Sequence, residues 1–374
     1  MNRYFIGLMS GTSLDGVDGV ILRHSASGVC VTHAKHLPMP TELRQTFLAL
    51  NTPGHNELHT AALATNRLMQ CHAQVVHALL EASGLSAGEI TAVGVHGQTV
   101  RHQPGPVGGV ADLHNPWAAY SVQLCNPALL AELCRTPVIA DFRSRDVAAG
   151  GQGAPLVPAF HQAVFGRSGA SVAVVNVGGM ANATLLGPQG EVSGFDTGPG
   201  NALMDLWCEI HTGQTYDDRG AWAASGQCLA PLLNDLLAEP YFSQQGARST
   251  GRDLFNKDWL DGRLAGHTGA TPADVQATLL SLTAHSIAQS LPRDLDTCVV
   301  CGGGALNATL MAKLQALLYP TRVITSDTAG MPAMQVEAAA FAWLALQTWQ
   351  GLPGNVPAAT GAKGLRVLGA VYPA

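Results

Sequence analysis

Two segments of the chain combine glycines with hydroxyl and carboxylate side chains in a spacing suited to phosphate binding. Residues 4–22 read YFIGLMSGTSLDGVDGVIL, and residues 171–186 read SVAVVNVGGMANATLL. In each, an apolar run turns through glycine and resumes an apolar alternation too short for a helix, which predicts a strand–turn–strand unit. Glycine lets backbone N–H groups approach an anion closely. The duplication predicts one nucleotide held between two lobes.

Two further glycine-rich turns, at 198–201 and 302–304, also follow predicted strands. One such turn alone is usually a simple connection, but four together favour nucleotide binding. None carries the G-x-x-x-x-G-K-[ST] of a P-loop, and the first leads into a strand rather than the helix that a Rossmann fingerprint requires. The pattern excludes the two commonest phosphate-binding motifs.

The elements that must position these turns alternate between strands and helices, which indicates an α/β protein. The chain has 374 residues, which favours two domains. We expect an N-terminal lobe at 1–168 and a C-terminal lobe at 169–374, whose tail at 351–374 could pack back on the first lobe. Helices are predicted at 41–83, 117–135, 200–211, 229–237, 275–291, 306–318 and 334–349, and strands at 90–95, 137–141, 192–195, 297–301 and 322–325.

Composition limits the class of protein. Hydrophobic residues make up 47 % and charged residues 12 % of the chain, with a formal net charge of −6. This balance favours a globular core and gives no basic surface for nucleic acid or an anionic membrane. The N-terminal apolar run is too short for a signal peptide, and no long uncharged apolar run follows, so we expect a cytoplasmic protein.

Eight cysteines are spread along the chain, a distribution typical of free thiols in a reducing compartment. Cys298 and Cys301 form a C-x-x-C that could be a redox pair or half of a zinc site. The pair lies in a predicted strand, however, and has no second C-x-x-C. We therefore favour core packing.

Six strings in register give the chain a more specific resemblance. They are GLMSGTSLDGVD (7–18), VHGQTVRH (95–102), GGQGAPLVP (150–158), NVGGMAN (176–182), FDTGPGN (195–201) and CGGGALN (301–307). Together they closely resemble the anhydro-N-acetylmuramic acid kinase family of the sugar kinase, heat-shock ATPase and actin superfamily. The resemblance implies two lobes, each with a mixed sheet flanked by helices. Their architecture would be that of a duplicated actin-like ATPase (ribonuclease H-like), with a cleft between the lobes.

The resemblance also implies an activity. The enzyme would use ATP and water to open the 1,6-anhydro bridge of anhydro-N-acetylmuramic acid, giving N-acetylmuramic acid 6-phosphate and ADP, in peptidoglycan recycling. Asp196 would be the catalytic base. The implied ATP-binding residues are Gly11, Thr12, Ser13, Leu14, Asp15, Gly16, Val17 and Asp18 in the first turn, Gly178, Gly179 and Asn182 in the second, and Gly302, Gly303, Gly304 and Asn307 around the adenosine.

The chemistry of these residues agrees with such roles. Ring opening needs a base to deprotonate water, and Asp196, at a strand end beside glycines, can accept that proton. The alternative is that Asp196 is the N-cap of the following helix. Asp15 could orient the hydration shell of Mg²⁺, which needs few direct carboxylates, but Asp15 and Asp18 could also be simple turn residues.

Five polar residues are candidates for sugar binding. His96 and Gln98 follow a strand where a sheet would meet a cleft and could contact sugar hydroxyls or the acetamido group, whereas the alternative for His96 is a structural histidine with satisfied hydrogen bonds. Arg143 could hold the lactyl carboxylate bidentately and Asp146 the sugar, or the two could form a surface ion pair. Glu337 could be a second acidic group at the site, or could stabilise the N-terminus of its helix.

Two other functions compete with this hypothesis. A kinase of the same fold could act on another small metabolite, which fold analogy does not exclude. A nucleotide-dependent conformational module without a small substrate is the other, although no appended peptide-binding domain is evident. A homodimer is possible for either.

Overall fold

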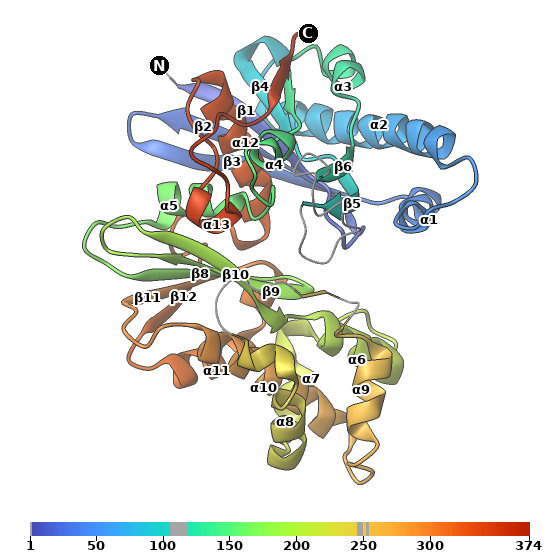
Figure 1. The fold of residues 1–374 in the computed structure, drawn as a ribbon, viewed down its shortest axis with the longest axis vertical. Helices are drawn as coiled ribbons and strands as arrows, with labels where there is room; N and C mark the ends of the chain where they lie inside the picture. Colours follow the sequence, from blue (N-terminus) through green and yellow to red (C-terminus); the bar gives the residue numbers. More distant parts are fainter. Residues whose placement is uncertain (1, 105–118, 245–249, 252–253) are drawn as a thin grey trace. The chain divides into compact units, whose positions relative to one another are not determined.

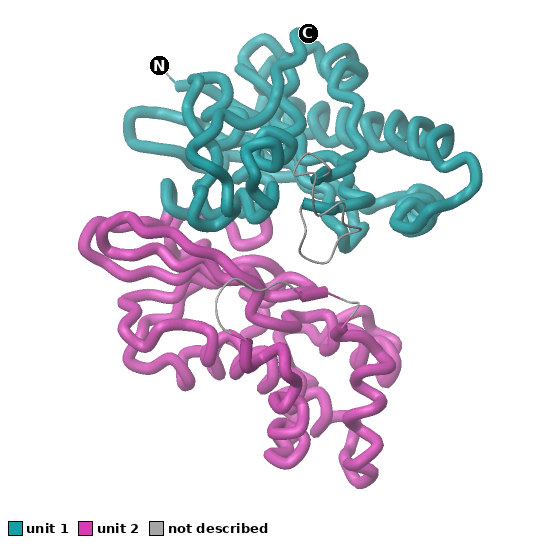
Figure 2. The backbone as a smooth tube through the Cα atoms, in the orientation of Figure 1, with its two compact units in different colours: residues 1–164, 335–374 teal, residues 165–334 magenta. Residues whose placement is uncertain are grey.

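The computed structural model describes residues 2–104, 119–244, 250–251 and 254–374. The chain forms two compact units, which are coloured separately in Figure 2. Unit 1 comprises residues 1–164 and 335–374, and unit 2 comprises residues 165–334. The first boundary lies close to the expected one at 168. Residues 335–350 differ from the expectation, because they belong to unit 1 and not to the second lobe. The tail at 351–374 also belongs to unit 1, which agrees with the possibility that it packs back on the first lobe.

Unit 1 is built on a six-stranded mixed sheet in the order β13-β7-β4-β1-β2-β3, of which β1 to β4 are labelled in Figure 1. β1, β2 and β3 are antiparallel, whereas β4 is parallel to β1 and β7 is parallel to β4. A separate pair is formed by β5 and β6. The strands are β1 (Arg3–Met9), β2 (Gly16–Ser25), β3 (Gly28–Pro38), β4 (Ile90–Val95), β5 (Gln98–Gln103), β6 (Tyr120–Leu124), β7 (Val138–Ala140) and β13 (Ala370–Tyr372).

Two long helices cover opposite faces of this sheet. Ile6 and Leu8 of β1 pack in one core with Leu68 and Val75 of α2, and the intervening Gly7 faces α12. The helices of unit 1 are α1 (Thr41–Leu50), α2 (Glu57–Ser83), η1 (Ala87–Glu89), α3 (Pro127–Cys134), α4 (Ser144–Ala148), α5 (Val157–Phe165), which ends at the boundary, α12 (Val336–Trp349) and α13 (Pro357–Thr360).

Glycines let α12 lie directly on the strands. A Cβ added at Gly7 would overlap the carbonyl oxygen of Ala338, and one added at Gly94 of β4 would overlap that of Phe341. The alanines of α12 are buried in the same contact, so backbone meets backbone. This close approach is why a helix late in the sequence joins the first unit.

Unit 2 repeats the same strand order. Its five-stranded sheet runs β10-β9-β8-β11-β12, with β8, β9 and β10 antiparallel and β11 and β12 parallel to β8. When the strands are numbered within each sheet, the sheet of unit 2 reads third, second, first, fourth, fifth, and the sheet of unit 1 reads the same with a sixth strand, β13, added at the end. The strands are β8 (Val172–Val177), β9 (Met180–Leu186), β10 (Val192–Pro199), β11 (Thr297–Cys301) and β12 (Arg322–Thr325). This repeated order is that of the duplicated actin-like, ribonuclease H-like architecture.

The core of unit 2 lies between one sheet face and its helices. Val175 and Val300 on the sheet pack in one cluster with Leu279 and Leu282 of α10. The helices are α6 (Ala202–Thr212), η2 (Asp218–Gly220), α7 (Ala221–Ser225), α8 (Ala230–Leu237), η3 (Pro240–Ser243), α9 (Lys257–Leu264), α10 (Pro272–Ser290), η4 (Gly303–Leu306), α11 (Ala308–Leu318) and η5 (Ala333–Gln335).

One expected helix is wrong. The helix at 117–135 was expected to be continuous, but residues 117–118 lie outside the described part, 120–124 form strand β6, and the helix α3 covers only Pro127–Cys134. Asn126 accepts the backbone N–H of Leu129 through its side chain and Pro127 follows, which together start the helix. The alternating segment before this cap pairs with β5 instead.

Candidate active site

In unit 1, the first glycine turn connects β1 to β2 over residues 10–15. Leu14 adopts a positive φ of 55° and its N–H donates to the carbonyl of Gly11 over 3.2 Å. Its side chain is buried in the core, as is that of Val17. Leu14 and Val17, which are predicted to bind the nucleotide, could therefore contact it only through their backbone atoms. Thr12, Ser13 and Asp15 are exposed, which leaves their hydroxyl and carboxylate groups accessible.

Glycine at position 11 is not required by the fold. A Cβ there would meet only ordinary contacts, the nearest being the Ser13 Oγ at 3.5 Å. The same holds for Gly178 in the second turn, where the nearest atom would be the Met180 carbonyl oxygen at 3.6 Å. Neither glycine has a positive φ. Close approach of a ligand to the backbone is a reason for glycine that packing does not supply.

Three carboxylates of unit 1 interact with one another at this turn. The pKa of Asp18 is raised by burial and by Asp15, although a 2.9 Å contact with the His36 ring opposes the shift. The pKa of Glu337, at the start of α12, is raised because protein surrounds it and because it faces Asp18 and Asp15, whereas Arg143 lowers it. Solvent still reaches the Glu337 side chain and screens these interactions.

His96 lies between the glycine turn and Arg143. Its Nδ1 is 3.1 Å from the carbonyl oxygen of Ser10 and 2.7 Å from that of Gly97, so Nδ1 carries the proton. Its Nε2 accepts from the Arg143 guanidinium over 2.7 Å and from the Gln123 amide over 2.9 Å. Burial and Arg143 lower the pKa of His96 to about 3. The ring is therefore neutral and fixes the orientation of Arg143.

Arg143 is held by neutral acceptors. Besides the contact with His96, it donates to the carbonyl of Gly153 over 2.7 Å. Burial lowers the pKa of Arg143 to about 10, so it stays a cation at neutral pH. Among the described residues no carboxylate forms an ion pair with it, and its Nε has no hydrogen-bond partner there. The alternative of a surface ion pair between Arg143 and Asp146 is therefore not found among the described residues.

Gln98, the first residue of β5, connects this strand to the glycine turn. Its amide donates to the Gly11 carbonyl over 3.1 Å, and its Oε1 is buried without a partner among the described residues. Gln123, which the sequence reasoning missed, donates to both His96 and Thr99. It lies on β6, within the segment that was expected to be helical, so no pattern in the sequence marked it.

Asp146 has a structural environment. Its side chain is fully buried and accepts from the Gly153 N–H at 2.9 Å, the Asn355 amide at 2.7 Å and the Thr360 hydroxyl at 2.8 Å. The carboxylate ties the loop after α4 to the C-terminal tail. The contact of Asp146 with the sugar stays a prediction. The buried carboxylate leaves no oxygen accessible for that contact.

Acid is expected to destabilise unit 1 through its buried histidines. Burial lowers the pKa of His72 to about 3, as for His96, and both His72 nitrogens lack a partner among the described residues. The unfolded chain takes up these protons near pH 6.5. Each histidine therefore contributes stability that is present above pH 6.5 and lost as pH falls towards 3, by about 1.4 kcal/mol per pH unit.

Urea denaturation from pH 7.5 to 5 should show this dependence of the free energy of unfolding on pH. His72→Leu should reduce the slope of the free energy of unfolding against pH by the contribution of one histidine. A slope that His72→Leu leaves unchanged would contradict this explanation.

In unit 2, three of the predicted segments meet at one edge of the sheet. The N–H groups of Gly200 and Asn201 donate to the carbonyls of Gly179 and Gly178 over 2.9 and 2.8 Å. A Cβ at Gly302 would overlap the Asn176 side chain, and the Asn201 amide lies 3.4 Å from where a Gly303 Cβ would be. The carboxyl ends of the parallel strands β8 and β11 bring these turns together.

The adenosine turn has a structural explanation of its own. Gly302 has a φ of 77°, and a Cβ on Gly304 would overlap Val177. Asn307 accepts the N–H of Leu310 over 2.9 Å and so caps α11. These residues are therefore required by the fold whether or not nucleotide binds, and their contacts with adenosine stay predictions.

Asp196 lies in a row of polar side chains across three strands. Asn182 is paired with both Asn176 and Asp196, so the three side chains share one face of the sheet. Thr250 donates its N–H to Asp196 Oδ2 over 3.0 Å, and Tyr241 donates its hydroxyl to the Asp196 carbonyl over 2.8 Å. The N-cap alternative is wrong, because Asp196 is inside β10 and the N-cap of α6 is Asn201.

The C-x-x-C lies within β11, and both cysteines are buried. Cys298 belongs to the core of unit 2, and burial raises its pKa to about 12. Strand alternation places Cys301 on the other face, where its thiol is 3.9 Å from Asn176 Oδ1. Packing therefore accounts for Cys298, and the two thiols do not face each other.

Comparison with known proteins gives a consistent result. The sequence profile of the family described as "Anhydro-N-acetylmuramic acid kinase" matches residues 3–374. A protein of that name from Variovorax paradoxus is 54 % identical, and the match covers 99 % of each chain. One from Albidiferax ferrireducens is 51 % identical, and the match covers 100 % of each chain. One from Pseudomonas paraeruginosa is 50 % identical, with 100 % of each chain covered. Within the described residues, none of the helices has the length and apolar character needed to cross a membrane.

Proposed function

Because the chain belongs to the anhydro-N-acetylmuramic acid kinase family and is a kinase, we propose that it phosphorylates anhydro-N-acetylmuramic acid at O6 while water opens the 1,6-anhydro ring. The products are N-acetylmuramic acid 6-phosphate and ADP. The reaction belongs to peptidoglycan recycling in the cytoplasm. ATP is the phosphate donor, and the small sugar anhydro-N-acetylmuramic acid is the phosphate acceptor.

One observation carries the choice of sugar, namely the Arg143 guanidinium. It is oriented by His96 and the Gly153 carbonyl and retains an unused Nε donor among the described residues. A guanidinium oriented by neutral acceptors is suited to an anionic group on a substrate. The lactyl carboxylate of a muramic acid supplies such a group, and the Gln98 Oε1 is an acceptor for a sugar hydroxyl or acetamido N–H.

The glycine turns support nucleotide binding in both units. Position 11 in unit 1 and position 178 in unit 2 have room for a side chain that the sequence does not use, which fits close approach of phosphate oxygens to backbone N–H groups. Asp15, exposed and bonded to the Ser13 hydroxyl over 2.8 Å, fits a Mg²⁺ ion held largely through water. When bound, the ion would neutralise charge on the phosphates. The cleft expected between the units stays a prediction.

Asp196 acts as the base in this scheme. It accepts a proton from water as the water oxygen bonds to C1 and the C1–O6 bond breaks. The released O6 bonds to the γ-phosphorus as the bond to the ADP oxygen breaks, so atoms and charge balance. The Thr250 N–H on Oδ2 favours the ionised form that can take the proton.

Oxygen labelling tests the proposal directly. The protein is incubated with Mg-ATP and anhydro-N-acetylmuramic acid in ¹⁸O-water, and the product is analysed by mass spectrometry. We expect label at C1 and phosphate on O6. Unlabelled product would remove water attack, and ADP formation that does not depend on the sugar would remove the substrate assignment.

A further inference from the structure

We propose that Tyr241 and the backbone N–H of Thr250 position the Asp196 carboxylate for proton transfer, and that Arg263 holds both groups in place from a distance. The inference rests on the proposed function, because it needs Asp196 to be the base. None of these residues was marked by the sequence motifs. Each is a positioning residue, since it acts on the reaction through Asp196.

The two direct contacts restrain different parts of Asp196. The Tyr241 hydroxyl donates to the Asp196 backbone carbonyl over 2.8 Å and so fixes the strand. The Thr250 N–H donates to Oδ2 over 3.0 Å and so fixes the side chain. β10 has an irregular register between Asp196 and Gly198, where the regular ladder no longer positions the chain. At this point two donors from outside the sheet contact Asp196.

Aromatic packing connects both donors to one helix. Tyr241 and Phe255 are buried and meet edge to face, with ring centroids 5.6 Å apart. Phe255 in turn meets Trp259 of α9 edge to face at 5.1 Å. The Phe255 N–H donates to the carbonyl of Gly251, the residue after Thr250. The position of α9 is therefore transmitted to Tyr241 through the rings and to Thr250 through the backbone.

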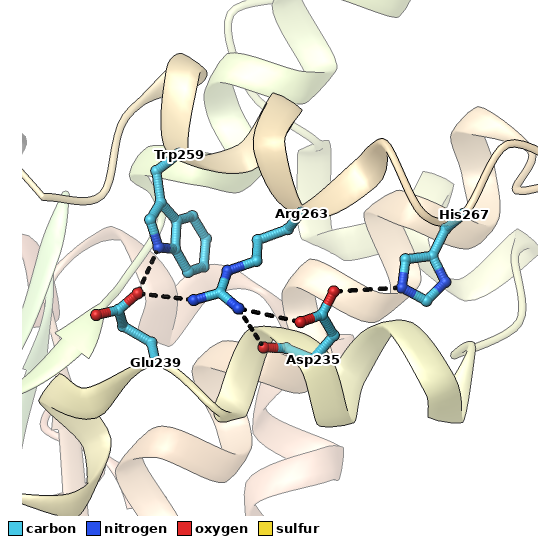
Figure 3. Close-up of polar contacts among 5 residues, drawn as sticks. All are labelled: Asp235, Glu239, Trp259, Arg263 and His267. Carbon is cyan, nitrogen blue, oxygen red and sulfur yellow. Dashed lines mark hydrogen bonds and ion pairs between the residues drawn. The ribbon is translucent and has the colours of Figure 1, made fainter.

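Arg263 fixes α9 against the segment that carries Tyr241. Figure 3 shows its guanidinium between the two carboxylates of Asp235 and Glu239. The distances are 3.0 Å to Asp235 Oδ1 and 2.9 Å to Glu239 Oε2, and Trp259 Nε1 donates to the same Glu239 oxygen over 2.8 Å. His267 lies 3.5 Å from the other Asp235 oxygen. Glu239 directly precedes η3, which contains Tyr241. The network therefore connects the segment of Tyr241 to α9, and α9 is connected to Thr250 through Phe255.

The geometry predicts two separable effects. Without the Tyr241 hydroxyl, the strand at Asp196 is less fixed, so turnover falls while the charge of the base is unaffected. Without Arg263, α9 is free to shift and the Thr250 N–H moves away from Oδ2. The ionised carboxylate then loses a donor and takes up its proton at higher pH.

The test compares Tyr241→Phe and Arg263→Met with the unchanged protein in the sugar-dependent ADP assay. For Tyr241→Phe we expect kcat to fall roughly three- to tenfold, as for loss of one hydrogen bond, with the KM for ATP and sugar unchanged. For Arg263→Met we expect the acid limb of the kcat–pH profile to move up by about half a unit to one unit.

Matched controls separate positioning from general stability. Tyr216→Phe removes a hydroxyl from an exposed tyrosine of unit 2, and Lys257→Met breaks the exposed Lys257–Asp261 pair on α9 itself. Both should keep the kcat and pH profile of the unchanged protein. All assays are run well below the melting temperature of each variant. If Arg263→Met does not fold, Tyr241→Phe, which only loses an oxygen, still decides.

Coupling to Asp196 provides the sharpest readout. In an Asp196→Asn background, adding Tyr241→Phe should leave the residual rate unchanged, because Tyr241 acts through the base. An equal further fall would overturn the proposal, as would wild-type kcat in Tyr241→Phe. If the unchanged protein makes no sugar-dependent ADP, the proposed function fails first, so the two failures are distinguishable.

Discussion

Replacing Asp196 by asparagine is expected to lower kcat by at least about 10² while ATP binding is retained. The amide has the shape of the carboxylate and keeps an oxygen that can accept the Thr250 N–H, so β10 should be undisturbed. It cannot take a proton from water, which removes the base. Single-turnover assays measure the chemical step, and titration calorimetry measures nucleotide binding.

Asp294→Asn is the matched control. Asp294 is exposed on unit 2 and undergoes the same chemical change away from the predicted site. It should keep full turnover. If Asp196→Asn also kept it, Asp196 would be a structural residue of β10, and the base would have to be sought among the other carboxylates.

Gly7→Ala is expected to lower the free energy of unfolding by about 3 kcal/mol, the largest stability effect we predict for a single methyl group. The added Cβ would overlap the Ala338 carbonyl oxygen and also reach the backbone of Ala342. Neither is the end of a flexible side chain, so α12 must move off β1. Urea denaturation followed by circular dichroism measures the change.

Gly54→Ala is the control for this substitution. An added Cβ at Gly54 meets nothing within 4 Å. Alanine there should be neutral or slightly stabilising, because it restricts the unfolded chain. An equal stability for Gly7→Ala and Gly54→Ala would show that α12 does not rest on the strand backbone.

Local patterns in the sequence predicted much of the fold because they depend on neighbouring residues. The apolar alternation of 90–95 and 297–301 matched β4 and β11, and the two glycine hairpins were recognised as a duplicated unit. The helix at 117–135 failed because its composition fits a helix, while β5 offered a partner that the sequence pattern did not show. Pairing with a distant strand overrides local propensity.

The glycine turns, the family and Asp196 could be identified from the amino-acid sequence, because each is recognised from a contiguous string of residues. Three other features depend on contacts between distant segments: residues 335–374 belong to unit 1, Asp146 is buried among tail residues, and Thr250 and Tyr241 donate to Asp196. The hydrogen bonds among these join residues at least 45 positions apart in the sequence. They form because buried donors and acceptors need hydrogen-bond partners and because the interior is close-packed. The spacing of neighbouring residues in the sequence does not reveal which distant residue becomes the partner.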